Sequence, residues 1–196
     1  MNSRLLRAAD YRRVRWRNGG GWTTEIAVAP SPDDPESFDW RVSIAEIDSD
    51  GAFSTFPGCD RYIALLDGPG MELTIDSGDP VRLDQRLKFV RFAGEAQTSG
   101  RLLGAPVRDF NVIVRRDAFS ADVLHRPLVG PMVFLPEAAT TWFIHLVGGQ
   151  ATLKGAAGME LSSGESLLLE PGGDPRNHVL NGGGEVVLVK LTRGTG

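Results

Sequence analysis

Short runs of β-branched and aromatic residues, separated by glycine and proline turns, recur along the whole chain. Examples are Tyr62–Leu66, Met71–Ile75 and Phe110–Arg115, and the turns include Gly68-Pro69-Gly70 and Asn181-Gly182-Gly183-Gly184. β-branched and aromatic side chains favour strands, whereas glycine and proline supply turn geometry. Many short, evenly spaced strands are typical of a sandwich or barrel. The sequence therefore predicts an all-β chain.

The composition supports a folded chain with many tight turns. Glycine accounts for 24 of 196 residues and proline for 12, while 41% of the residues are apolar. The combined share of glycine and proline lies below the ~25–30% that suggests disorder. Only Val81–Val90 spaces Leu83, Leu87 and Val90 as a helix would. We expect a strand pair there instead.

A weak internal repeat predicts two domains of similar build. Leu66-Asp67-Gly68, followed by Leu73, matches Leu146-Val147-Gly148, followed by Leu153. Further along, Phe89–Gly94 resembles Leu167–Gly172, and chance matching of glycine and leucine is the alternative explanation. Two barrels of ~80–100 residues agree with usual domain sizes. We expect an N-terminal domain over residues 1–117 that holds the ligand pocket and a C-terminal domain over residues 118–196.

Charge, cysteine content and hydropathy argue against several classes of protein. The net charge of −4 argues against a general nucleic-acid or membrane-surface binder. The arginines among residues 1–17 are expected on an edge strand, where charge discourages further pairing. The single cysteine, Cys59, excludes an internal disulfide framework. Without a signal peptide or a span of ~18–20 apolar residues, we expect a cytoplasmic protein with no nucleic-acid or membrane partner.

Four motifs resemble those of the HutD/Ves family and occur in the family's order. They are W-R-N-G-G-G at Trp16–Gly21, W-R-V-S-I-A at Trp40–Ala45, G-A-F-S-T-F-P-G-C-D-R at Gly51–Arg61 and D-F-N at Asp109–Asn111. In the C-terminal half, Leu146–Pro171 resembles a cupin. The resemblance implies a bicupin, with two tandem cupin-like β-barrels of the RmlC-like jelly-roll type. It also implies a link to histidine-utilisation operons, or to stress responses in the Ves branch.

A cupin metal site is not expected. A catalytic cupin holds its ion with a His-x-His pair, a glutamate and a later histidine, whereas this chain has only His125, His145 and His178. These three do not form a His-x-His pair, and a zinc or iron site normally needs three or four protein ligands. We therefore expect no metal and no other cofactor.

Arg61 and Asn111 are the leading candidates for a ligand site. Arg61 directly precedes an apolar strand, and an arginine at the mouth of a barrel can hold a carboxylate through two parallel hydrogen bonds. The alternative is a surface ion pair with Asp60 or Asp67, but the resemblance favours the ligand role. Asn111 shares a strand face with Arg115 and can donate to a ligand and accept from it. Its alternative role is to satisfy a turn or bulge.

The other candidate ligand-binding residues come from the first three motifs. Trp40 can stack on a planar ligand or fill the core. Glu25 interrupts an apolar strand, where it can act as a base or simply face solvent. The glycines of the first motif allow the backbone to approach a ligand, although a plain loop is the alternative. The residues expected to line the site besides Arg61, Asn111 and Arg115 are Asn18, Gly20, Glu25, Trp40, Ser43 and Phe56.

The resemblance favours an accessory or regulatory protein over a pathway enzyme. We expect it to bind a small carboxylate metabolite of histidine degradation, such as urocanate or an N-formyl- or N-formimino-glutamate. A metal-independent isomerase or hydrolase acting on a similar carboxylate is the alternative. A protein–protein interaction module is a second alternative, and a homodimer is left open.

Overall fold

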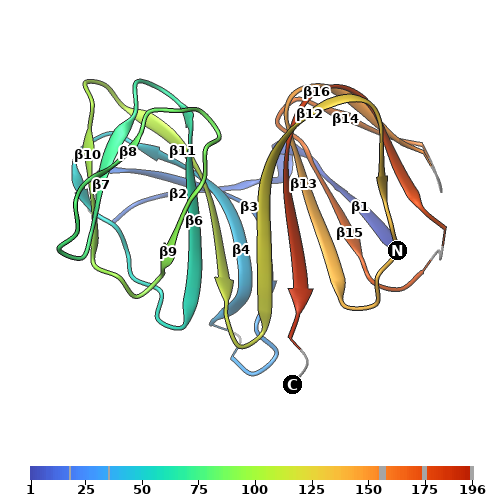
Figure 1. Cartoon of the computed structure of the whole chain (residues 1–196), viewed down its shortest axis with the longest axis horizontal. Coiled ribbons are helices and arrows are strands. Elements are labelled where there is room, and N and C mark those ends of the chain that lie inside the picture. The colour runs from blue at the N-terminus through green and yellow to red at the C-terminus, as the bar shows by residue number, and fades with distance from the viewer. Residues whose placement is uncertain (18, 35, 155–157, 174–175, 195–196) are drawn as a thin grey trace. The chain divides into compact units, whose positions relative to one another are not determined.

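The computed structural model describes residues 1–17, 19–34, 36–154, 158–173 and 176–194 (Figure 1). Apart from the short 3-10 helix η1 (Ala8–Asp10), the regular elements of these residues are β-strands, so the all-β prediction is confirmed. The chain divides into two compact units. The central unit is Tyr11–Ala118, and the terminal unit combines Met1–Asp10 with Phe119–Gly196.

The central unit contains two antiparallel sheets. The six-stranded sheet has the order β2 (Arg12–Arg15), β3 (Gly21–Pro30), β4 (Phe38–Ile47), β11 (Val107–Arg115), β6 (Cys59–Asp67) and β9 (Val90–Ala93). The four-stranded sheet has the order β5 (Gly51–Ala52), β10 (Thr98–Leu102), β7 (Met71–Ile75) and β8 (Val81–Leu83). The arginine-rich β2 lies at the edge of its sheet, as expected.

One face of the six-stranded sheet packs against the four-stranded sheet, and we call it the inner face. It contributes Ala45, Ile63 and Val107 to a core shared with Met71 and Leu73 of the other sheet. Because side chains alternate along a strand, every second residue of β4, β6 and β11 points to this face. The inner face therefore determines which polar side chains meet inside the unit.

The terminal unit contains one six-stranded antiparallel sheet around an apolar core. Its strand order is β1 (Asn2–Leu6), β15 (Ser166–Glu170), β13 (Thr140–Lys154), β16 (His178–Arg193) and β12 (Phe119–Phe134), with β14 (Met159–Ser162) paired to β13. Its core includes Phe134, Ile144, Leu146, Leu167 and Leu180, all at most 2% exposed.

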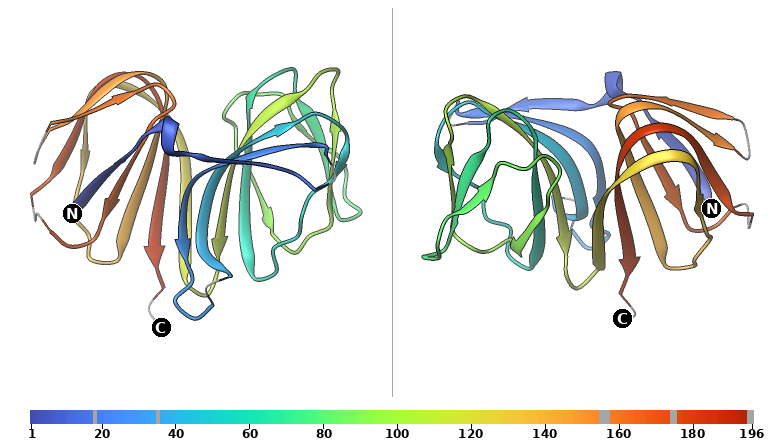
Figure 2. Two further views of the ribbon diagram at one scale, coloured as in Figure 1. Left: turned by 180° about the vertical axis from the view of Figure 1, so that it is seen from behind. Right: turned by 45° about the horizontal axis from the view of Figure 1, so that its top comes forward.

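The first ten residues belong to the terminal unit, so assigning residues 1–117 to a single domain is wrong at its start. β1 pairs antiparallel with β15 along its whole length, from Asn2 opposite Glu170 to Leu6 opposite Ser166. Met1 is buried in the core of this unit, and Leu5 packs against that core. Figure 2 shows the dark blue β1 among the orange and red strands. Apolar burial and strand pairing therefore join the chain start to a strand near the other end of the sequence.

Two glycine clusters that predict turns lie inside long strands instead. Gly148-Gly149 lies within β13, and Asn181–Gly184 lies within β16. A register shift between Leu146 and Gly148 keeps the two strands paired. A Cβ at Gly184 would lie 1.9 Å from the carbonyl oxygen of Gly148, and one at Gly149 would lie 2.0 Å from that of Gly183. These glycines therefore permit close backbone approach within the sheet.

The Val81–Val90 region contributes strand residues at both ends with a turn between them, and its two strands do not pair with each other. β8 pairs with β7 in the four-stranded sheet, whereas β9 pairs with β6 in the six-stranded sheet. The internal repeat corresponds to matching pairings, since β9 returns to β6 as β15 returns to β13. Within the described residues, no helix is long and apolar enough to cross a membrane.

Gly184→Ala is expected to destabilise the terminal unit. Gly184 has φ +136°, and its added Cβ would meet Gly148 backbone. The backbone strain alone costs about 1–3 kcal/mol. Gly183→Ala is the matched control, because a Cβ at Gly183 meets nothing within 4 Å. Urea unfolding should show a loss of stability for Gly184→Ala and little change for Gly183→Ala; equal losses would contradict this account of the glycines.

Candidate functional site

A buried polar cluster lies on the inner face of the central unit. Its centre consists of Arg61 on β6 with Asp109 and Asn111 on β11, which are 6%, 0% and 3% exposed. Alternation along β11 places Asp109 and Asn111 on the same face. The pairing of β6 with β11, in which Asn111 lies opposite Ile63, brings Arg61 alongside. Two strand segments about 50 residues apart therefore build this cluster.

Asn111 holds the guanidinium of Arg61. Its Oδ1 accepts hydrogen bonds from Nε at 3.0 Å and from Nη2 at 2.8 Å. Its Nδ2 donates to Oδ1 of Asp109. The two leading candidate residues are therefore bonded to each other, which the sequence did not predict, and the alternative surface ion pair with Asp60 is not formed. Asp60 instead pairs with Arg91 and Arg116.

Aromatic rings surround the two arginines of the inner face. The Arg61 Cζ lies 4.7 Å from the ring centroid of Phe53, 5.6 Å from that of Phe92 and 6.0 Å from that of Phe56. Arg41 Cζ lies 5.1 Å from the centroid of Phe56. A cation within about 6 Å of a ring is attracted by its quadrupole. Phe56, a predicted site residue, thus contacts both guanidinium groups.

Burial changes the pKa of both charged groups at the centre of the cluster. It lowers the pKa of Arg61 to about 10, with Asp109 opposing the shift and Arg41 adding to it. It raises the pKa of Asp109 to about 7, with Arg61 opposing the shift. At neutral pH, Arg61 is therefore charged, whereas Asp109 exists in both its neutral and its ionised form.

Glu25, Ser43 and Arg41 extend the cluster along the sheet. Ser43 on β4 lies opposite Asn111 on one side and opposite Glu25 of β3 on the other. Burial lowers the pKa of Arg41, and the charge of Glu25 opposes that shift. The structure thus brings two predicted residues, Glu25 and Ser43, into the neighbourhood of Asn111.

Arg41 and Asp109 were missed as site residues by the sequence reasoning. Both lie inside motifs of the family resemblance, and both share a strand face with a predicted residue, Ser43 or Asn111. That alternation was the signal that could have identified them. Their importance depends on burial, which no local pattern of the sequence specifies.

Two predicted residues do not join the cluster. Trp40 points to the opposite face of β4 from Arg41 and is buried there, so the core-filling alternative describes it. Arg115 lies at the end of β11, where its Nη2 is 3.1 Å from Oδ1 of Asp39 and its Nη1 donates to Oγ of Ser31 at 2.8 Å. Those bonds anchor the strand end. The prediction for Asn18 falls outside the described residues.

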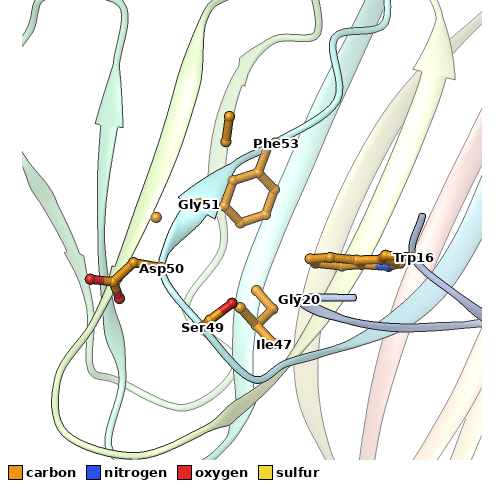
Figure 3. A pocket seen from close by; sticks show the side chains of 9 residues that line it. Trp16, Gly20, Ile47, Ser49, Asp50, Gly51 and Phe53 are labelled. Carbon is orange, nitrogen blue, oxygen red and sulfur yellow. The ribbon is translucent and has the colours of Figure 1, made fainter. Parts of the chain in front are cut away.

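A small open pocket lies beside the cluster. Figure 3 shows the rings of Trp16 and Phe53 at its sides and Ile47 below them, with the carboxylate of Asp50 directed away from Trp16. Gly20, another predicted residue, also lines it. The ring of Phe53 therefore borders this pocket and also lies next to the guanidinium of Arg61.

The histidines occupy separate positions in the terminal unit. His125 Nε2 lies 3.1 Å from Glu185, His145 Nδ1 lies 2.9 Å from Ser166, and His178 Nδ1 lies 3.2 Å from the carbonyl of Arg176. Among the residues placed by the structure, no three His, Cys, Asp or Glu side chains are grouped to hold a metal ion.

Asp109→Asn is expected to change how stability depends on pH. The folded-state pKa of about 7 exceeds the unfolded value of ~3.9, so the folded protein binds more protons in between. Stability from this group is fully present below the lower value and is lost as pH rises through the upper one. As the pH is raised from about 5 to about 8, denaturant unfolding should show wild type losing stability relative to Asp109→Asn. The exposed Asp67→Asn is the control; a parallel pH dependence of wild type and Asp109→Asn would contradict the assignment.

Comparison with known sequences identifies close relatives. A family model described as HutD matches residues 8–188. The chain is 46% identical over 117 residues to an uncharacterized 21.2 kDa protein in the hutC 3' region of Pseudomonas putida, covering 60% of each. It is 41% identical over 111 residues to Protein Ves of Cronobacter sakazakii, covering 55% of this chain and 58% of that protein. The matched part thus spans about 60% of these curated relatives.

Solved structures match this chain over nearly its whole length. HutD from Pseudomonas fluorescens SBW25, determined in a formate condition, is 32% identical with a TM-score of 0.84, and 99% of this chain and 100% of that chain are covered. A nickel(II) complex of the bacterial pirin YhhW from Escherichia coli is 13% identical, with a TM-score of 0.73 and 97% and 99% of the chains covered. That similarity shows a cupin-like fold alone. Because the family model matches nearly the whole sequence and a solved HutD shares the fold at full length, the chain belongs to the HutD family.

Proposed function

We propose that the central unit binds a small carboxylate metabolite and that the protein is an accessory or regulatory component of histidine degradation. The observation that carries this proposal is the bonding of Arg61. Its Nε and Nη2 both donate to Asn111, while its Nη1 makes no hydrogen bond with the described residues. A buried guanidinium with a donor to spare is suited to a charge-assisted bond with a carboxylate.

The second arginine of the inner face favours a ligand with two acidic groups. Arg41 lies close enough to lower the pKa of Arg61, and its buried Nε has no hydrogen-bond partner among the described residues. Buried donors without partners are costly, and an anionic ligand would satisfy them. Among metabolites of histidine degradation, N-formyl- and N-formimino-glutamate carry two carboxylates and urocanate carries one. We therefore favour the N-substituted glutamates.

The rest of the ligand is proposed to extend toward the pocket lined by Trp16 and Phe53. Phe53 contacts both this pocket and the Arg61 guanidinium, so a shift of its ring would connect them. Ligand sites are commonly apolar hollows with a few convergent polar groups. Glu25 and Ser43 would supply further polar contacts near Asn111.

We also propose that the protein consists of two cupin-like barrels and is cytoplasmic. We assign the central and terminal units as two cupin-like jelly-roll barrels, with the ligand in the first. The similarity in fold to pirin supports this assignment. A reducing cytoplasm agrees with a single buried, unpaired cysteine, Cys59. The relative encoded in the hutC 3' region supports the link to histidine utilisation.

A metal-independent enzyme is the second candidate. Asp109 favours it, because a buried carboxyl with a pKa of about 7 suits general acid–base catalysis. Turnover separates the two functions. A binding protein should return the carboxylate unchanged after long incubation, whereas an isomerase or hydrolase should convert it, and nuclear magnetic resonance of the mixture measures this directly.

Calorimetric titration tests the binding site. Wild type is titrated with urocanate, N-formyl-glutamate and N-formimino-glutamate. Arg61→Ala should weaken binding about 10- to 150-fold, which corresponds to roughly 1.5–3 kcal/mol. Arg61→Lys should restore only part of that loss, because an ammonium lacks the planar fork of donors. Asn111→Ala should also weaken binding without unfolding the protein.

Arg82→Ala provides the matched control for these titrations. Arg82 is an exposed arginine of β8 that pairs with Asp84, and its loss should leave the affinity unchanged. Circular dichroism should confirm that each variant is folded. Equal affinity of wild type and Arg61→Ala would show that Arg61 is not part of the site. If wild type binds none of the three compounds, the proposed ligand class is rejected.

A further inference from the structure

Asp109 is a fully buried carboxyl group, and burial of an ionised carboxylate is costly unless it is paired. It is 0% exposed, and its neighbours across the sheet are Ala45 on β4 and Leu65 on β6. Its Oδ1 accepts from Nδ2 of Asn111, but its Oδ2 has no hydrogen-bond partner among the described residues. A buried, unpartnered oxygen disfavours the ionised carboxylate over the neutral acid.

A short series of charged groups links Asp109 to the strands packed around it. Arg61 of β6 is the charge that acts on it directly. Arg41 of β4 acts on Arg61, and Glu25 of β3 acts on Arg41. Arg61 is therefore the counter-ion of an ionised Asp109, and a carboxylate bound at Arg61 would compete for the same positive charge.

On the basis of the carboxylate site proposed above, we infer that Asp109 takes up one proton from solvent when a carboxylate binds at Arg61. The only bond formed is an O–H bond on the Asp109 carboxyl, and the buffer supplies the proton. Arg61 then neutralises the ligand instead of Asp109. At Arg61, binding thus exchanges one buried anion for another.

Asp109 also positions the residue that holds Arg61. An asparagine side chain has one accepting and one donating end. Because Asp109 accepts from Nδ2 of Asn111, Oδ1 of that amide is directed to Arg61. Asp109 is therefore a positioning residue that acts through Asn111, and its carboxyl does not need to touch the ligand.

The expected pH dependence follows from this exchange. The pKa of Asp109 is about 7 in the free protein, where burial raises it, and a second anion beside Arg61 raises it further. Below about pH 7, Asp109 is already neutral and the affinity should not depend on pH. Above that value, each further pH unit should weaken binding by up to about tenfold, because a proton must be taken up.

Two variants at position 109 separate proton uptake by Asp109 from its positioning of Asn111. Asp109→Asn keeps an oxygen that can accept from Asn111 but cannot titrate, so its affinity should lose the pH dependence. Asp109→Ala removes the acceptor as well and should bind more weakly at every pH. Asp67→Asn is the matched control, since Asp67 is an exposed carboxyl at the end of β6 and outside the cluster, and proton uptake should persist in it.

Calorimetry in several buffers measures the proton directly. N-formyl-L-glutamate is the probe, because its carboxylates stay ionised near neutral pH and it lacks the titrating imidazole of urocanate. At about pH 8, titrations in buffers of different ionisation enthalpy should show uptake of close to one proton per ligand by wild type and by Asp67→Asn. Asp109→Asn should show none.

The possible results test the role of Asp109 separately from the existence of the carboxylate site. Binding by wild type without proton uptake, or uptake that persists in Asp109→Asn, overturns the role of Asp109 and leaves the carboxylate site intact. Failure of wild type to bind the probe overturns both. Should Asp109→Asn not fold, infrared difference spectra of wild type with isotopically labelled aspartate replace it. A protonated aspartic acid band must then appear on ligand addition, and its absence overturns the inference.

Discussion

The contact between Arg61 and Asn111 is the interaction on which the central unit depends. A guanidinium inside an apolar core is tolerated only where its donors are satisfied. Asn111 accepts from Nε and Nη2 of Arg61, and the ring of Phe53 lies next to the cation. The cost of burying this charge is acceptable only if the site has a use, and an exposed arginine would have served stability better. The buried pair of Arg61 and Asn111 is therefore the place where we propose that a ligand binds.

The two units use similar strands for different purposes. The inner face of the central unit carries Arg41, Arg61 and Asp109, whereas the terminal unit has an apolar cluster that includes Ile144 and Leu167 and also buries His145 and Ser166. Burying a charged group costs stability, whereas burying apolar side chains supplies it. In the terminal unit, the glycines of β13 and β16 allow the backbones of these paired strands to approach closely.

Much of the site could be predicted because strand side chains alternate. The motifs indicated Arg61 and Asn111. Because side chains alternate between the two faces of a strand, the sequence also placed Ser43 on one face of β4 and Trp40 on the other. The sequence left open whether Trp40 stacks on a ligand or fills the core, because it does not say which face is turned toward Arg61. In the structure, Trp40 is buried on the opposite face of β4 from Arg41. Asp109 was missed because an aspartate at a strand start resembles a solvent-exposed residue until its burial is known.

The sequence by itself determined the type of secondary structure, the arginine-rich edge strand and the residues that share a strand face. These features depend on local preferences and on a repeat of two residues, which a single segment reveals. The tertiary structure decided which strands pair, so it alone brought Arg61 to Asn111 and residues 1–10 to β15. It also decided that Gly148-Gly149 continues a strand instead of turning it. Register and burial arise from contacts between segments distant in the sequence, and a local pattern carries no information about them.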